Sequence, residues 1–162
     1  MNAYFTTPER LQALATEAAR WPGTPFVSYG AFPGPRGGAS CHCLCGAVLA
    51  GAGWTVGEVL PRYKVNHAQH HAEGVMLPWL RARPEKFAEI APASIELLLP
   101  GDLAISPLDG LCDHHMGVAI PGGRVLHTLR RRGAHTIERS DPALRAYLTA
   151  IFRPLAWEGM PA

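Results

Sequence analysis

The stretch SCHCLCGAVLAGAG, residues 40–53, decides how the rest of the chain is interpreted. Its apolar side chains recur every three or four residues, which is typical of a helix that buries one face, at Leu44, Cys45, Val48, Leu49 and Ala52. Residues 30–38 are rich in glycine and proline, so they are expected to form a loop. Cys41 is therefore expected where a loop becomes a helix. Free backbone N–H groups and the helix dipole favour a thiolate there, which makes Cys41 a candidate nucleophile.

The composition favours one globular domain that spans residues 1–162. The chain has 48% hydrophobic and 17% charged residues, and its net charge of +2 gives no argument for nucleic acid. The dense basic cluster at residues 130–132 is interpreted as a solvated loop. No apolar stretch approaches the roughly 18 residues of a membrane span. The amino-terminal sequence lacks the pattern of a secretory signal, so we expect synthesis in the cytoplasm without such a signal.

The four cysteines do not form the pattern of a disulfide framework. Three of them crowd at positions 41, 43 and 45, too close to pair easily with one another, so free thiols or metal ligands are expected. Their spacing is not that of common zinc sites, and no cofactor is expected. A zinc site is kept as an alternative, with ligands drawn from Cys41, Cys43, Cys45, Cys112 and His114 or His115.

Helices are expected before residue 54 and strands after residue 100. Pro8 after Thr6 and Thr7 is typical of a helix start, with one of the threonines as N-cap. Alternating and β-branched patterns predict strands at residues 103–105, 114–120, 124–129, 136–138 and 148–153, with a helical turn at 142–147. This order favours an α+β fold, with the nucleophile helix packed on a C-terminal antiparallel sheet.

The segment between residues 54 and 100 gives weaker signals. Helical turns are suggested by Leu77, Leu80 and Phe87 and are expected to break at Pro78 and Pro84. Three histidines lie within residues 67–71, and a solvated helix edge is the preferred interpretation over a metal site.

The hairpin around residues 121–123 determines which histidines can meet. If these three residues form the loop, Ile120 pairs with Arg124, and His115 lies on the same face as His127, one diagonal step away. A two-residue loop would place the two histidines on opposite faces. A cysteine, a histidine that takes its proton, and a polar residue that orients the histidine together make a nucleophile site.

Several motifs resemble the NlpC-type cell-wall peptidases, with the closest likeness to their phage-associated branch. The motifs occur in the same order along nearly the whole chain: Trp21-x-Gly23-Thr24-Pro25-Phe26, Gly38-x-x-Cys41-x-x-Leu44, Leu60-Pro61-Arg62-Tyr63, Pro100-Gly101-Asp102-Leu103, His115-x-Gly117-Val118-Ala119-Ile120, Val125-Leu126-His127 and Phe152-Arg153-Pro154. The resemblance implies a papain-like fold in which the N-terminal helices, including the nucleophile helix, pack on an antiparallel sheet or half-barrel.

The resemblance also implies an activity and a site. Cys41 would be the nucleophile, His115 the base and His127 the residue that orients it, in a cysteine endopeptidase or amidase that cleaves peptidoglycan stem peptides. The family usually has an acidic residue before the nucleophile, and Ser40 stands there in this chain. The residues assigned to substrate binding are Ser40, His42 and Tyr29. Phage-tail proteins are the expected partners, and a virion or phage tail the expected location. A fold retained for structure or binding without catalysis is the other alternative.

Overall fold

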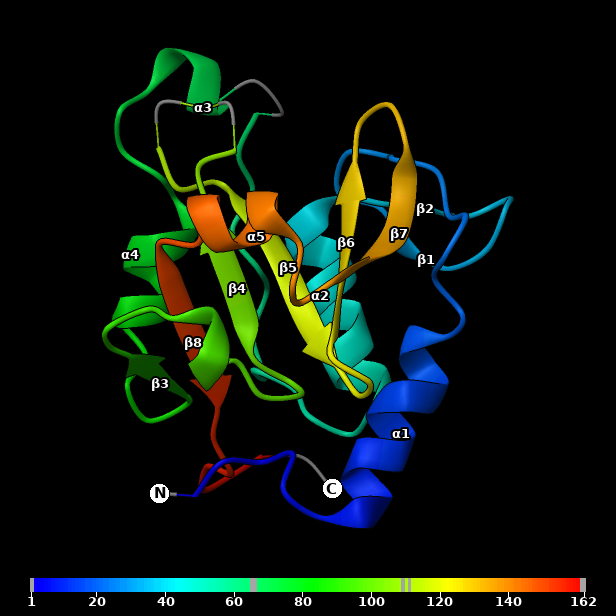
Figure 1. The fold of residues 1–162 in the computed structure, drawn as a ribbon, viewed down its shortest axis with the longest axis vertical. Helices are drawn as coiled ribbons and strands as arrows, with labels where there is room; N and C mark the ends of the chain where they lie inside the picture. The colour runs from blue at the N-terminus through cyan, green and yellow to red at the C-terminus, as the bar shows by residue number, and fades with distance from the viewer. Residues whose placement is uncertain (1, 65–66, 109, 111, 161–162) are drawn as a thin grey trace.

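The computed structural model describes residues 2–64, 67–108, 110 and 112–160. The two longest helices come first, and the main sheet comes from the second half of the chain (Figure 1). The helices are α1 (Pro8–Ala18), α2 (Cys41–Gly51), α3 (His67–His70), α4 (Met76–Arg81) and α5 (Pro142–Tyr147), with a 3-10 helix, η1 (Ile95–Leu97). The strands are β1 (Ala31–Phe32), β2 (Gly38–Ala39), β3 (Phe87–Ile90), β4 (Leu103–Ser106), β5 (His115–Ile120), β6 (Arg124–Leu129), β7 (Gly133–Glu138) and β8 (Ala150–Pro154).

The main sheet has six antiparallel strands in the order β3-β8-β4-β5-β6-β7. The last strand, β8, returns to lie between β3 and β4. Helix α2 packs against β5 and β6, and Figure 1 shows it crossing behind them. This arrangement confirms the predicted α+β class and the packing of the nucleophile helix on the C-terminal sheet.

The first two helices begin where the sequence predicts. The Thr7 side chain accepts a hydrogen bond from the Arg10 N–H at 3.4 Å, so Thr7 is the N-cap of α1. Helix α2 begins at Cys41 and buries the apolar residues that its spacing marks, Leu44, Cys45, Val48 and Leu49. Among the described residues, no helix has the length and apolar character needed to cross a membrane.

Both faces of the sheet are covered by apolar side chains. The larger core lies between the sheet and helices α1 and α2, and includes Leu14, Trp21, Leu44, Val118 and Phe152. The smaller core joins η1 to the opposite face, where Figure 1 shows η1 and α5 in front of the strands. Its buried members are Ile95, Leu98, Ala104, Ala119, Val125 and Ile151. The alternation along β5 therefore serves two cores, because neighbouring residues point to opposite faces.

The middle segment differs from its prediction in two places. Pro78 does not break a helix, because it lies in the first turn of α4, where its missing N–H has no intrahelical partner to lose. Phe87 belongs to strand β3 rather than to a helical turn. The helical spacing that includes Phe87 is misleading, because pairing of β3 with β8 decides the local conformation.

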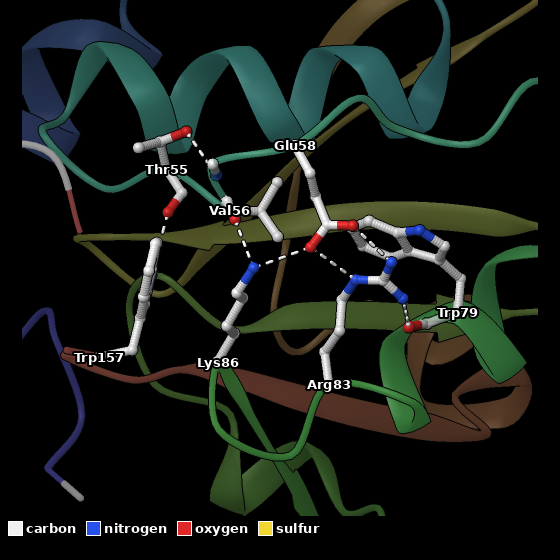
Figure 2. Close-up of polar contacts among 8 residues, drawn as sticks. Thr55, Val56, Glu58, Trp79, Arg83, Lys86 and Trp157 are labelled. Atoms are coloured by element: carbon white, nitrogen blue, oxygen red, sulfur yellow. Dashed lines mark hydrogen bonds and ion pairs between the residues drawn. The ribbon is translucent and has the colours of Figure 1, made fainter. Parts of the chain in front are cut away.

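A network of charged and aromatic side chains holds residues 55–58 against the segment that joins α4 to the edge strand β3 (Figure 2). Glu58 accepts hydrogen bonds from Arg83 at 2.9 Å and from Lys86 at 2.8 Å. These two cations hold the pKa of Glu58 down at about 2. The Lys86 ammonium lies 4.7 Å from the ring centroid of Trp157, whose indole N–H donates to the Thr55 carbonyl at 3.1 Å.

Candidate active site

The Cys41 thiol lies against the beginning of strand β5. Cys41 is the first residue of α2, and its Sγ is 3.7 Å from the carbonyl oxygen of His114. Burial raises the pKa of this thiol, and the backbone N–H groups of Met116 and His42 oppose that effect. The thiolate expected at the helix start is therefore not the favoured resting form, because desolvation outweighs the helix end.

His115 and His127 meet as the three-residue hairpin loop requires. Ile120 pairs with Arg124, which confirms the predicted register. His115 Nε2 lies 2.9 Å from His127 Nδ1, and the two buried rings meet edge to face. A Cβ atom at Gly117 would lie 2.7 Å from a Val125 methyl carbon, so a glycine is needed for this close approach of the strands.

Both histidines are neutral near pH 7. Burial lowers the pKa of His115 to about 3 and that of His127 to about 4. Because Nε2 of His115 is engaged by His127, Nδ1 of His115 is the nitrogen left to exchange a proton. His127 Nε2 is buried without a partner among the described residues, and the His135 ring centroid lies 4.3 Å from that of His127.

Cys41 and His115 line one cleft of about 1050 Å³. His127 is not among its lining residues and lies behind His115, in the position of an orienting group. The cleft is bounded by the loop before α2, by the start of β5 and by the turn between β6 and β7. Its lining residues are Phe26, Ser28, Tyr29, Ser40, Cys41, His42, Tyr63, Leu108, His114, His115, Thr128, Leu129, Arg130, Arg131 and Tyr147.

The three residues predicted to bind substrate all reach this cleft. Ser40 is the N-cap residue of α2, but its hydroxyl caps no N–H and has no partner among the described residues. Tyr29 donates its hydroxyl to the backbone carbonyl of Tyr63. His42 is buried, and its Nδ1 lies 3.2 Å from the Tyr63 hydroxyl oxygen.

Sequence reasoning missed three residues that line the cleft. The sequence marks Tyr63 only as part of a motif, yet its hydroxyl approaches both His42 and the His114 carbonyl. The basic cluster that contains Arg130 and Arg131 predicts a solvated loop, yet both residues line the cleft. Their position was hidden because it depends on how the β6–β7 turn folds over the start of α2.

Within the part of the chain that the structure describes, the other cysteines join no group of metal-ligating side chains. Cys43, Cys45 and Cys112 are free thiols, as is Cys41. Across residues 2–64, 67–108, 110 and 112–160, no three His, Cys, Asp or Glu side chains converge as metal ligands would. The zinc alternative therefore has no supporting geometry in these parts of the chain.

Comparison with known proteins supports the fold. No protein-family model matches the sequence, and no curated protein matches it. One similar solved structure, a Staphylococcus aureus subsp. aureus Mu50 protein described as similar to lipoprotein of the NLP/P60 family, is 21% identical with a TM-score of 0.61 over 96% of this chain and 45% of that one. The NlpC/p60 domain of the peptidoglycan hydrolase SagA is 18% identical, with a TM-score of 0.51 over 89% of this chain and 97% of that one.

A third similar structure is an NlpC/P60 family protein from Bacillus cereus ATCC 10987. It is 19% identical, with a TM-score of 0.55 over 94% of this chain and 42% of that one. The chain thus spans less than half the length of two of these proteins and nearly all of the SagA domain. The chain therefore has the papain-like fold of the NlpC/P60 proteins, as the motifs along its sequence predicted.

Proposed function

We propose that this chain is a cysteine peptidase or amidase that hydrolyses an amide bond in peptidoglycan stem peptides. One observation carries the proposal: Cys41 begins a helix in the same cleft as His115, and His127 holds the far nitrogen of His115 at 2.9 Å. The similar SagA domain, which belongs to a peptidoglycan hydrolase, supports the substrate class.

The proposed reaction uses one proton that His115 carries back and forth. His115 Nδ1 takes the proton of Cys41 as Sγ attacks the amide carbonyl carbon, and then delivers it to the leaving amine nitrogen as the C–N bond breaks. Water then gives a proton to His115 and its oxygen to the thioester, which releases the carboxylic product and restores the thiol. In this reaction His127 Nδ1 accepts the Nε2–H of His115 and so stabilises the imidazolium, at the cost of leaving its own Nε2–H without an acceptor among the described residues. The backbone N–H of Cys41 would hold the oxyanion.

Cys41 and His115 are both neutral before the reaction, which favours proton transfer during the attack rather than before it. Burial raises the pKa of Cys41 and lowers that of His115, so an ion pair is not formed in advance. The thiol loses its proton during attack, when the developing imidazolium is stabilised by His127.

The charge of the cleft indicates which part of a stem peptide it would hold. Arg130 and Arg131 line it, and none of its described lining residues is an Asp or Glu. Ser40 stands where the NlpC-type family that the sequence resembles usually has an acidic residue. A peptide segment that presents carboxylates therefore suits this cleft better than a free amino terminus.

Digestion of peptidoglycan tests the proposal. The purified protein should release new amine and carboxyl ends, detected by mass spectrometry of soluble fragments, and Cys41→Ala should release none. Cys43→Ala is the matched control, because Cys43 is a free thiol on the same helix that does not line the cleft. Cleavage by Cys41→Ala at the native rate would refute the assignment of the nucleophile.

A second candidate function is a fold that binds peptide without cleaving it. The raised pKa of the Cys41 thiol favours this candidate, because a thiol that only packs needs no activation. Binding of soluble stem peptides by a protein that releases no fragments would support it. Association with a phage tail stays a prediction from the sequence resemblance.

A further inference from the structure

The Tyr63 hydroxyl lies beside the thiol of the candidate nucleophile. Its oxygen is 3.4 Å from the His114 carbonyl oxygen, the same atom that lies 3.7 Å from Cys41 Sγ. Burial raises the pKa of the thiol, and the nearby Tyr63 hydroxyl is the smallest of the effects that oppose this rise. The thiol and the phenol thus share one carbonyl, and both face the cleft.

His42 controls the direction of the Tyr63 proton. His42 Nδ1 is 3.2 Å from the Tyr63 oxygen, and the two rings stack with centroids 4.8 Å apart. His42 Nε2 is buried without a partner among the described residues. A buried N–H without an acceptor is rarer in proteins than a buried acceptor without a donor. The favoured tautomer of His42 therefore carries its proton on Nδ1 and donates it to the Tyr63 oxygen.

This donation leaves the Tyr63 O–H free to point away from His42. A hydroxyl hydrogen rotates about its C–O bond, so it can turn from the His114 carbonyl to the sulfur. Burial lowers the pKa of His42 to about 4, so the imidazole is neutral near pH 7 and keeps a single N–H. Burial raises the pKa of Tyr63, so the phenol stays protonated and remains a donor.

We propose that Tyr63 is a catalytic residue that donates a hydrogen bond to Cys41 Sγ as the thiolate forms, and that His42 is the positioning residue that directs this bond. The proposal rests on the assignment of Cys41 as the nucleophile. In the thiol form, the S–H points to the His114 carbonyl. When His115 takes that proton, the carbonyl and the thiolate repel each other, and the Tyr63 O–H turns to the sulfur. No proton leaves Tyr63 in this step.

Packing fixes the segment that carries Tyr63. A Cβ atom at Gly46 of α2 would lie 2.7 Å from a Leu60 methyl carbon, so the segment rests directly on the helix. The Tyr63 carbonyl accepts the Tyr29 hydroxyl from the opposite side. Glu58, five residues earlier, is held by Arg83 and Lys86 (Figure 2). The hydroxyl is therefore held in place before a substrate arrives.

Other titratable groups surround the sulfur and would affect it together with Tyr63. They are Cys43 and Cys45 on α2, His42 beside it, and His114 and His115 at the start of β5. The test must therefore change the Tyr63 hydroxyl and leave these groups in place.

The test is the rate at which iodoacetamide labels Cys41, measured from about pH 6 to about pH 10 with peptide mapping to identify the labelled thiol. Tyr63→Phe removes the hydroxyl and keeps the ring. We expect its labelling midpoint to rise by about one pH unit, because a thiolate loses a charge-assisted hydrogen bond. Tyr147→Phe removes a hydroxyl from the same cleft and should leave the midpoint unchanged.

A pair of substitutions at His42 tests the positioning role. His42→Asn keeps an N–H near the place of Nδ1 and should keep the native midpoint, whereas His42→Leu should raise it. If Tyr63→Phe fails to fold, this pair decides the question, because Tyr63 is unchanged in both variants. If His42 had only a structural role, the His42→Asn and His42→Leu variants would have the same pH midpoint of Cys41 labelling.

The proposal is overturned if Tyr63→Phe labels with the native midpoint, or if His42→Asn and His42→Leu shift the midpoint equally. The readout needs no substrate. A protein in which Cys41 labels as expected but peptidoglycan stays intact would refute the proposed function and leave this inference standing.

Discussion

The buried histidines of the cleft should make the protein sensitive to mild acid. His42, His115 and His127 are only 4%, 8% and 7% exposed. Burial lowers their pKa values from 6.5 to about 4, about 3 and about 4, respectively. Between these values and about 6.5, the unfolded chain binds protons that the folded protein excludes, so the free energy of unfolding falls as the pH falls through this range.

The size of the effect follows from the same pKa values. At pH about 5, a histidine with a pKa near 4 when folded and 6.5 when unfolded loses about 2 kcal/mol of stability relative to pH about 7. If the three groups act independently, they lose about 6 kcal/mol together. This is a large part of the roughly 5–15 kcal/mol by which domains are stable. Carboxylates add little in this range, since their unfolded pKa values lie near 4.

Urea unfolding followed by circular dichroism at the two pH values measures this loss. His42→Asn is the informative variant, because it removes one titrating group and keeps a polar side chain. Its own cost is the same at both pH values, so its loss between them should be smaller than the native loss by about 2 kcal/mol. A native loss below about 2 kcal/mol, or equal losses in the native protein and His42→Asn, would contradict the reasoning.

Two further predictions concern catalysis and stability. His115→Ala should lower kcat/KM on a peptidoglycan substrate by about 10²–10⁴, and His127→Ala by less, since it acts only through His115; the opposite order would mean that the base and its orienting residue are exchanged. Asp102→Ala should lower the free energy of unfolding by about 3–5 kcal/mol, because it leaves the Arg153 guanidinium without its partner at 2.8 Å in a largely buried ion pair. Glu89→Ala is the control, since it breaks an exposed bidentate pair and should cost less than about 1 kcal/mol in urea unfolding.

Much of the fold could be predicted from local sequence patterns. The three-residue loop at 121–123 fixes the register of β5 and β6, and that register places His115 beside His127. The apolar spacing after Cys41 likewise fixes which face of α2 is buried. These features depend on a few neighbouring residues, so periodicity and turn chemistry are enough to find them.

The parts that the sequence did not predict depend on contacts between distant segments. Tyr63 reaches Cys41 only because its segment lies on Gly46, and no local pattern encodes that placement. The pKa of Cys41 follows from how deeply β5 and Tyr63 bury it, which a helix-end argument ignores. The place of Arg130 in the cleft also depends on distant segments. A residue in a turn is expected to be solvated unless the surface that faces the turn is known.

The network around Glu58 has a consequence for the dynamics of the cleft. Residues 57–64 are fastened to α2 through Leu60 and to the far end of the sheet through Arg83 and Lys86. The conformational entropy of this segment is therefore lost when the protein folds, and substrate binding does not have to order it. The ion pairs are partly exposed, so added salt weakens them. A higher ionic strength should thus make the segment that carries Tyr63 more mobile, although the ion pairs of Glu58 lie outside the cleft.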